Sequence, residues 1–166
     1  IVVTSTNQYD DILYDKLNKI GVDCFRGEET NVYKRFLDAI KNSEATVILR
    51  ITADCPLIDP VLVDKIIRDF LNKDVEYVSN VNPPSFPDGM DVEVFTKRAL
   101  LEANSKTLSK YDREHVTPWI RNNKEYKKNS DLGYYSKNAN RSPKNERFLN
   151  CISERLWACL LYTSDA

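Results

Sequence analysis

Apolar and polar positions alternate along the first half of the chain in blocks that predict strands followed by helices. Short β-branched runs are typical of buried strands, and apolar residues spaced three or four apart are typical of helices that bury one face. The predicted strands lie at residues 1–6, 22–25, 46–51 and 75–78, and the predicted helices lie between them at 12–20, 33–40 and 59–70. Such alternation favours right-handed crossovers and a mainly parallel sheet. We therefore predict an α/β fold with three layers, in which helices cover both faces of a Rossmann-like sheet.

The segment after residue 79 departs from this regular alternation. Residues 80–89 contain three prolines and a glycine, and a loop of this length is typical of an active-site flap. Residues 91–95 alternate with a period of two, so their carboxylates share one face of a strand and their valines share the other. Residues 112–122 have the apolar spacing of a helix, in which Pro118 would remove a hydrogen bond or cause a kink.

Composition limits the classes of function that this chain can have. Its 166 residues are 42% hydrophobic, which suits one α/β domain better than two. Lys and Arg number 24 against 25 for Asp and Glu, so no overall positive field exists to hold a nucleic acid. The apolar runs are far shorter than the roughly 18 residues that cross a bilayer. We therefore expect neither a nucleic-acid partner nor a membrane span.

The cysteines and the histidine restrict the chemistry further. Four cysteines, at positions 24, 55, 151 and 159, have neither the spacing of a zinc site nor that of a disulfide framework. This pattern favours a reduced, cytoplasmic protein. His115 is the single histidine, so a site that needs several imidazoles is excluded. A metal site would have to use carboxylates, which favour a hard ion such as Mg²⁺.

The most informative segment runs from the predicted strand at 46–51 into the turn formed by Thr52, Ala53 and Asp54. Ligands of open α/β sheets bind at the carboxyl ends of the strands, and Asp54 lies just past such an end. A carboxylate placed there can hold a divalent metal ion against phosphate oxygens. The small residues Thr52 and Ala53 allow the backbone to approach a nucleotide closely. Asp-X-Pro sequences are also common in plain turns, so the residues alone leave a capping role for Asp54 open.

Residues 50–60, with the sequence RITADCPLIDP, resemble the signature of the spore-coat polysaccharide cytidylyltransferase-like family. That family is related to the acylneuraminate and deoxy-octulosonate cytidylyltransferases of the nucleotide-diphospho-sugar transferase superfamily. The resemblance covers residues 1–136. Four further motifs carry it: FRG at 25–27, YVSN at 77–80, FPDGMDVEVF at 86–95 and DREHVTP at 112–118. Five motifs in one order are difficult to obtain by chance.

The resemblance implies a transfer of CMP from CTP to a sugar or sugar acid, with Mg²⁺ as cofactor, in the synthesis of surface polysaccharide for the cell envelope or spore coat. Asp54 matches the family's metal-binding carboxylate and would be the catalytic residue, with Thr52 and Ala53 lining the nucleotide. By the same resemblance Arg26 and Gly27 would border the nucleotide pocket, although a glycine turn with a solvated arginine is an equally good interpretation.

A second group of candidates lies on the flap, on the strand after it and in the predicted helix near residue 112. Asp88, Asp91 and Glu93 would bind sugar hydroxyls or support a second metal ion. The alternative is that they form the wet face of a half-exposed strand. His115 would contact the substrate, although a lone histidine is more often a structural or interface group.

Two features of the enzymes that this chain resembles have no counterpart here. Their first strand and its phosphate-binding loop, of the type Arg-X-X-Ser-X-Arg-X-Pro-X-Lys, are missing, so we expect residues 1–140 to be an incomplete nucleotidyltransferase domain. Their later strand with a second metal-binding aspartate is not matched by residues 157–160. We expect residues 141–166 to be a tail of uncertain origin, because its end resembles translated adapter sequence. An incomplete domain of this kind could be a fragment that does not catalyse the reaction by itself.

Two other functions fit parts of the pattern. A metal-dependent glycosyltransferase of similar architecture would hold a sugar nucleotide through a carboxylate-bound metal ion. Such enzymes commonly have two aspartates around one residue, and Asp54 has no partner at position 52 or 56. A non-catalytic dimerisation module would instead pack the arm at residues 111–136 on a partner. Related cytidylyltransferases often dimerise through this later region, so a homodimer is expected under either interpretation.

Overall fold

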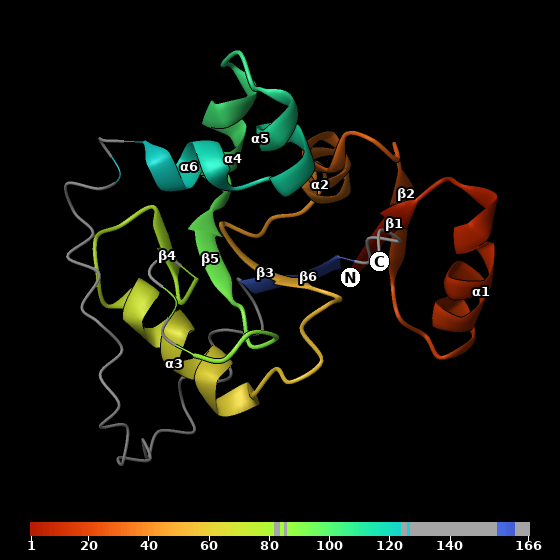
Figure 1. The fold of residues 1–166 in the computed structure, drawn as a ribbon, viewed down its shortest axis with the longest axis horizontal. Helices are drawn as coiled ribbons and strands as arrows, with labels where there is room; N and C mark the ends of the chain where they lie inside the picture. The colour runs from red at the N-terminus through yellow and green to blue at the C-terminus, as the bar shows by residue number, and fades with distance from the viewer. Residues whose placement is uncertain (82–83, 85, 124–125, 127–155, 162–166) are drawn as a thin grey trace.

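The computed structural model describes residues 1–81, 84, 86–123 and 126, together with the backbone of residues 156–161 (Figure 1). Its centre is a 6-stranded sheet with the order β2-β1-β6-β3-β5-β4. The strands are β1 (Val2–Ser5), β2 (Cys24–Gly27), β3 (Val47–Thr52), β4 (Tyr77–Ser79), β5 (Glu93–Thr96) and β6 (Leu156–Leu161). Neighbouring strands from β2 to β3 pair in parallel, and β5 pairs antiparallel with both β3 and β4. The prediction of a mainly parallel sheet is therefore confirmed.

Helices cover both faces of this sheet. They are η1 (Gln8–Asp10), α1 (Asp11–Lys19), α2 (Val32–Ile40), α3 (Pro60–Leu71), α4 (Lys97–Asn104), α5 (Lys110–His115) and α6 (Pro118–Asn122). Figure 1 shows α2, α4, α5 and α6 on one side of the sheet, α3 on the other side and α1 beside the β1–β2 edge. The predicted three-layer α/β/α architecture is confirmed.

The two faces of the sheet bury separate hydrophobic cores because successive strand residues point in opposite directions. Ile48 and Phe95 enter the core under α2, α4 and α6. Their neighbours Leu49 and Val94 enter the core under α3. Each of these four side chains is at most 4% exposed, so β3 and β5 each contribute to both cores.

Local capping fixes where several helices begin. The side chain of Asp59 accepts a hydrogen bond from the Val61 N–H at 2.9 Å, and Pro60 occupies the first turn of α3. Ser109 and Asp112 form a reciprocal capping box at the start of α5. These arrangements satisfy N–H groups that the first helical turn leaves without a partner.

The prediction of one helix over residues 112–122 is wrong. The structure has two short helices, because α5 ends at His115 and α6 begins at Pro118. Proline has no N–H group and its ring clashes with the preceding turn, but both properties are harmless at the first position of a helix. Pro118 therefore starts a new helix instead of kinking an existing one.

The sequence predicts that the domain ends near residue 140 and that residues 141–166 form a separate tail. In the structure, residues 156–161 of that tail form β6, which lies between β1 and β3 in the sheet. The register pairs Val47 with Leu156, Thr52 with Leu161 and Val2 with Leu160. The sheet thus includes a strand from the segment that was expected to be a tail. Among the described residues, no helix has the length and apolar character needed to span a bilayer.

Candidate functional site

The carboxyl end of β3 presents the turn that the sequence singles out. Thr52 is the last residue of β3, and its hydroxyl donates a hydrogen bond to the Asp54 carboxylate. The Cys55 N–H donates to the Thr52 carbonyl oxygen at 3.1 Å, and the Cys55 side chain is buried beneath the turn. Ala53 and Asp54 are both exposed. The turn therefore has a fixed base and an accessible carboxylate.

The far end of the predicted flap packs against this turn. The Leu57 N–H donates to the Gly89 carbonyl oxygen at 3.1 Å. Gly89 has a φ angle of 86°, a conformation that side chains other than glycine rarely adopt. A Cβ atom there would lie 3.5 Å from Pro56 and 3.9 Å from the carbonyl oxygen of Asp54. Gly89 thus allows the flap to return close to the Asp54 turn.

Asn80 joins the two ends of the same flap. Its side-chain amide donates to the Met90 carbonyl oxygen at 2.7 Å, and its side-chain oxygen accepts from the Val92 N–H at 2.8 Å. Asn80 is 2% exposed. The flap is therefore closed at its base by a buried amide, and its last residues are held beside the end of β3.

Acidic side chains gather where the flap returns to the sheet. Asp91 precedes β5 and is half-buried. Burial raises the pKa of Asp91, and neighbouring carboxylates raise it further. Those neighbours are Asp88, Glu93 and Asp54, while Arg50 acts in the opposite direction. The structure therefore brings together the carboxylates that the sequence placed on the turn, the flap and the strand.

Glu93 is the centre of a buried hydrogen-bond network. Its carboxylate accepts from the hydroxyls of Tyr77 and Thr117, each at 2.6 Å, and forms an ion pair with Arg50. The Glu93 side chain is 5% exposed. Burial and the adjacent Glu93 carboxylate raise the pKa of Tyr77 well above its ordinary value, which keeps its hydroxyl a donor. The alternative that Glu93 lies on a wet strand face is therefore wrong.

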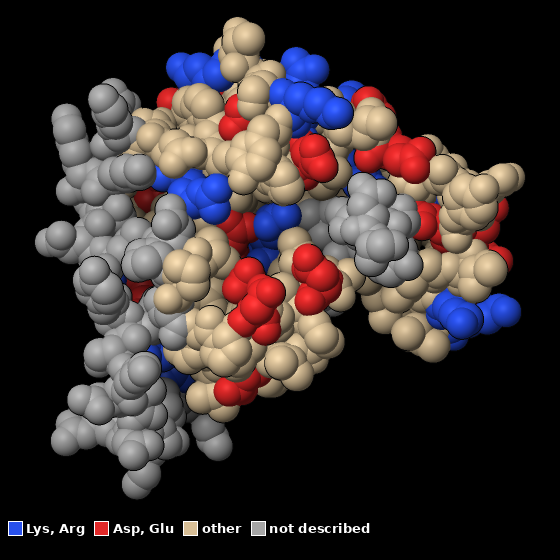
Figure 2. Space-filling model, in the orientation of Figure 1, with Lys and Arg blue, Asp and Glu red and all other residues tan. Residues whose placement is uncertain are grey.

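A cavity of about 150 Å³ lies between this network and the α5–α6 pair. It is lined by Arg50, Thr52, Val81, Asp91, Glu93, Tyr111, His115, Thr117, Pro118 and Arg121. Four predicted site residues are thus brought to one cavity, namely Thr52, Asp91, Glu93 and His115. Figure 2 shows acidic side chains next to basic ones near the middle of the face it presents, below α5 and α6.

The cavity offers donors that the described part of the chain leaves unused. The Nε atoms of Arg50 and Arg121 are buried and have no hydrogen-bond partner among the described residues. Buried polar groups without a partner are costly, and both arginines line the cavity, so a ligand oxygen that reached either atom would be stabilised there. His115 is exposed at the rim, and its ring packs on Tyr111 with centroids 4.2 Å apart. The cavity can therefore donate to and accept from one polar ligand.

Arg26 lies elsewhere and is engaged by its own surroundings. Its Nε donates to the Ser5 carbonyl oxygen and its Nη2 to the Asn7 carbonyl oxygen, both at 2.8 Å. Nη1 pairs with Asp11 at 2.7 Å, and the guanidinium stacks over the Tyr14 ring at 5.3 Å. Arg26 therefore connects β2 to the end of β1 and to α1.

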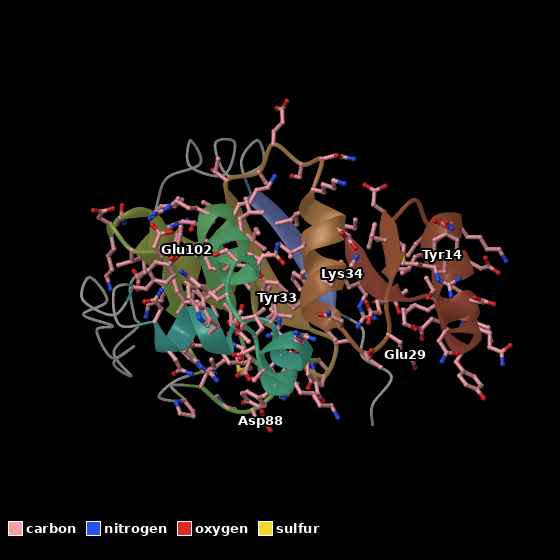
Figure 3. All side chains as sticks on the ribbon, turned by 90° about the horizontal axis from the view of Figure 1, so that it is seen from above. Tyr14, Glu29, Tyr33, Lys34, Asp88 and Glu102 are labelled. Carbon is pink, nitrogen blue, oxygen red and sulfur yellow. The ribbon has the colours of Figure 1, made fainter. Side chains whose placement is uncertain are left out.

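Arg26 and Gly27 are not brought to the cavity. β2 is separated from β3 by β1 and β6, so about 14 Å lies between the two strands at the usual strand spacing. Figure 3 likewise shows Tyr14, on which Arg26 stacks, on a different part of the molecule from Asp88. A Cβ atom at Gly27 would lie 3.0 Å from the Arg35 side chain, so the close approach here is to α2.

The donor set at the end of β3 can be compared with the needs of Mg²⁺. Among the described residues, no group of three or more His, Cys, Asp or Glu side chains is arranged to hold a metal ion. Mg²⁺ is commonly held by one or two carboxylates, with substrate phosphates and water completing its octahedron. Asp54, with Asp91 close enough to be coupled to it electrostatically, satisfies that smaller requirement.

Sequence reasoning missed Arg50, Thr117 and Arg121 as cavity residues. One signal could have found the first of them, because Arg50 interrupts the apolar run of a buried strand. A charge in that position requires a buried counter-charge. Glu93, which points to the same face of the sheet, provides it. Nothing in the sequence indicates that the start of α6 joins this pair.

Comparisons with known proteins agree with this geometry. A mainly parallel α/β sheet with ligand-binding groups at its carboxyl edge is the general arrangement of nucleotide-binding proteins. The family model for cytidylyltransferases matches residues 1–157. The chain therefore belongs to the cytidylyltransferase family.

Two individual proteins are similar in sequence to this chain. The chain is 41% identical over 123 residues to an uncharacterized protein of Methanocaldococcus jannaschii, covering 74% of this chain and 49% of that protein. It is 34% identical over 123 residues to the spore coat polysaccharide biosynthesis protein SpsF of Bacillus subtilis, covering 74% of this chain and 50% of that protein.

A solved structure of a cytidylyltransferase from Leptospira borgpetersenii superimposes with a TM-score of 0.69 at 35% identity, over 75% of this chain and 53% of that one. The chain thus spans about half the length of the proteins it matches.

Proposed function

We propose that the protein to which this chain belongs transfers CMP from CTP to a hydroxyl group of a sugar or sugar acid. In this reaction the hydroxyl oxygen forms a bond to the α-phosphorus of CTP. The bond from that phosphorus to the bridging oxygen breaks, and pyrophosphate leaves with the electron pair. The hydroxyl proton is released. Family membership supports this transfer over the alternative of a sugar-nucleotide glycosyltransferase.

The observation that carries the proposal is the accessible Asp54 carboxylate at the end of β3, with the flap folded beside it. Thr52 orients this carboxylate through its hydroxyl, and the small Ala53 leaves room for the nucleotide. Asp54 would hold Mg²⁺, with Asp91 nearby. A bound Mg²⁺ would neutralise charge on the phosphates as the leaving group departs. Asp54 is therefore assigned as the essential residue.

The cavity beside this turn is assigned to the acceptor. A sugar presents several hydroxyl groups that both donate and accept hydrogen bonds. The half-buried Asp91 would accept, whereas Arg50 and Arg121, which line the cavity, would donate. His115 at the rim can do either. Because Thr52 belongs both to the Asp54 turn and to the cavity wall, an acceptor held there would lie next to the nucleotide.

The wider setting of the reaction follows from the relatives. SpsF is named for the synthesis of spore coat polysaccharide. We place the product of this protein correspondingly in surface-polysaccharide synthesis of the cell envelope or spore coat. The activating step belongs in the cytoplasm, where CTP is available. A homodimer through the arm at residues 111–136 is part of the same proposal, and most of that arm beyond Asn123 lies outside the described residues.

Calorimetric titration of CTP with Mg²⁺ into this chain and into its Asp54→Ala variant tests the proposal. UDP-sugars and ATP serve as comparison ligands. Asp15→Ala is the matched control, because Asp15 is an exposed carboxylate on α1, which lies beside the β1–β2 edge of the sheet and away from β3. We expect CTP binding that requires Mg²⁺, is lost in Asp54→Ala and is retained in Asp15→Ala.

Other outcomes of this titration would contradict the proposal. Preferential binding of a UDP-sugar would favour the glycosyltransferase. A folded chain that binds none of these nucleotides would contradict the assignment of the Asp54 turn as a nucleotide site.

A further inference from the structure

The junction between α5 and α6 contains a backbone conformation that stands out in the described part of the chain. Val116 has φ 68° and ψ −53°, and no other non-glycine residue described there has a positive φ angle. The Thr117 N–H donates to the His115 carbonyl oxygen at 2.8 Å, which closes a three-residue γ-turn. This form of the γ-turn is rare and strained, and positive φ in a β-branched residue is a genuine outlier.

The helix that follows this turn lacks its usual side-chain cap. Thr117 is the N-cap residue of α6 but makes no capping hydrogen bond, although threonine commonly makes one there. Its hydroxyl donates to the buried Glu93 carboxylate at 2.6 Å instead. Two local departures from ideal geometry therefore adjoin each other, and both are compatible with Thr117 pointing into the cavity network.

The strained residue itself does not line the cavity. Val116 is 0% exposed and belongs to the core cluster that also contains Phe36, Leu100 and Ile120. Its two neighbours in sequence, His115 and Thr117, both line the cavity. Strained conformations persist only where the surrounding structure over-determines them, and they concentrate at binding sites. The core thus holds the Val116 side chain, and the turn at Val116 fixes how two cavity residues, His115 and Thr117, lie relative to each other.

We propose that Val116 is a positioning residue for the acceptor, acting through His115 and Thr117. Its side chain is held by the core, and the tight turn sets how α6 follows α5. The Thr117 hydroxyl thereby reaches Glu93, while His115, which packs on Tyr111 within α5, lies at the other side of the turn on the cavity rim. This inference rests on the proposed function, because it takes the cavity to be the acceptor site. The effect of the turn on His115 is nevertheless measurable without any substrate.

His115 makes a direct test practical because it is the single histidine of the chain. The imidazole signals of a histidine-labelled sample therefore belong to one residue in a nuclear magnetic resonance spectrum. Val116→Gly is the main variant, since glycine adopts positive and negative φ with similar ease and no longer fixes the turn. Val78→Ala is the matched control, because Val78 is 1% exposed in the core on the other face of the sheet.

We expect Val116→Gly to move the His115 signals, because the end of α5 and the His115 ring then lose their fixed placement against Thr117 and α6. Val78→Ala should leave the His115 signals in place although it also lowers stability. Val116→Ile, which keeps a buried β-branched side chain, should retain the wild-type signals. If Val116→Gly does not fold, Val116→Ala gives the same comparison with a smaller change. Unaltered His115 signals in the folded variant would overturn the inference.

A second arm tests the link to the acceptor. The chain, saturated with CDP and Mg²⁺ so that no CMP transfer with loss of pyrophosphate can occur, is titrated with N-acetylneuraminate as a charged sugar and with N-acetylglucosamine as an uncharged one. Whichever sugar binds, we expect Val116→Gly to lower the affinity for it by about tenfold, since small misplacements of positioning groups have effects of this order. CTP affinity should change by less than about twofold, as for a substitution remote from a site.

The two arms separate the failure of this inference from the failure of the proposed function. Wild-type chain that binds neither sugar, or a variant in which sugar and CTP affinities fall together, would contradict the positioning role. Absence of Mg²⁺-dependent CTP binding in the wild-type chain would contradict the proposed function, while the His115 comparison would still decide whether Val116 fixes the turn.

Discussion

Two strand ends at the same edge of the sheet carry polar residues but use them differently. At the end of β2, each of the three guanidinium nitrogens of Arg26 has a protein partner. These partners are Ser5, Asn7 and Asp11. At the end of β3, the Asp54 carboxylate has its neighbouring Thr52 as a partner and remains exposed. A charged residue at a strand end is therefore available to a ligand only where the fold has not already satisfied it.

The same contrast separates two carboxylates on one short segment. Glu93 is buried and bonded to Arg50, Tyr77 and Thr117. Asp91, two residues earlier, is half-buried, and its pKa is raised by burial and, less strongly, by neighbouring carboxylates. Substitution of a charged residue that already has protein partners, here called a satisfied charge, should mainly lower folding stability. Substitution of a charged residue that remains accessible, here called an open charge, should mainly lower ligand affinity. The predictions below test this division.

Glu93→Ala should have the largest effect on stability. Removing one partner of a buried ion pair leaves the other charge uncompensated, and such changes cost about 3–5 kcal/mol. Urea unfolding followed by circular dichroism measures the loss. Asp54→Ala is the comparison, because an exposed carboxylate should change the free energy of unfolding by no more than about 0.5 kcal/mol. Equal losses in the two variants would show that the division between satisfied and open charges is wrong.

Arg26→Ala should lower stability by about 1–3 kcal/mol, because it removes the hydrogen bonds to the Ser5 and Asn7 carbonyl oxygens and the ion pair with Asp11. Mg²⁺-dependent CTP affinity should stay within about twofold of the wild-type value. Arg113→Ala, at an exposed arginine of α5, is the control for loss of one positive charge. Loss of CTP binding at unchanged stability would support the nucleotide role that the sequence predicts for Arg26.

Gly89→Ala should lower stability less than Glu93→Ala or Arg26→Ala, by about 1–2 kcal/mol, because alanine must adopt the positive φ angle of 86°. It should also weaken CTP binding, since Gly89 holds the flap beside the Asp54 turn. Gly21→Ala is the matched control, with φ 72° and open space around it. Both variants should lose similar stability, and a fall in CTP affinity in both would argue against a specific role for the flap.

Much of the fold could be predicted from the sequence because its signals are local. Apolar spacing located the strands and helices of the first half, and the glycine and prolines of residues 80–89 located the flap. The same reasoning failed at residues 112–122, where apolar spacing continues across Pro118 but the backbone does not. Periodicity does not report which helical position a proline occupies. Only the packing of α5 and α6 against the core decides that.

The candidate site shows the same limit. Thr52, Ala53 and Asp54 could be chosen from the sequence because their position after a buried strand is itself the argument. Glu93 could be named but its environment could not, since its partners come from β3, β4 and the start of α6. Contacts between residues far apart in the chain leave no local pattern.

The sequence by itself determined the alternation of strands and helices, the polar turn after β3 and the family to which its motifs point. The tertiary structure decided which charges are satisfied and which remain open. The physical reason is that hydrogen-bond capacity is used up by neighbours in space, and for Arg26, Glu93 and Thr117 most of those neighbours are distant in the chain. The strained turn at Val116 belongs to this second group, because only a packed core can hold a valine in that conformation.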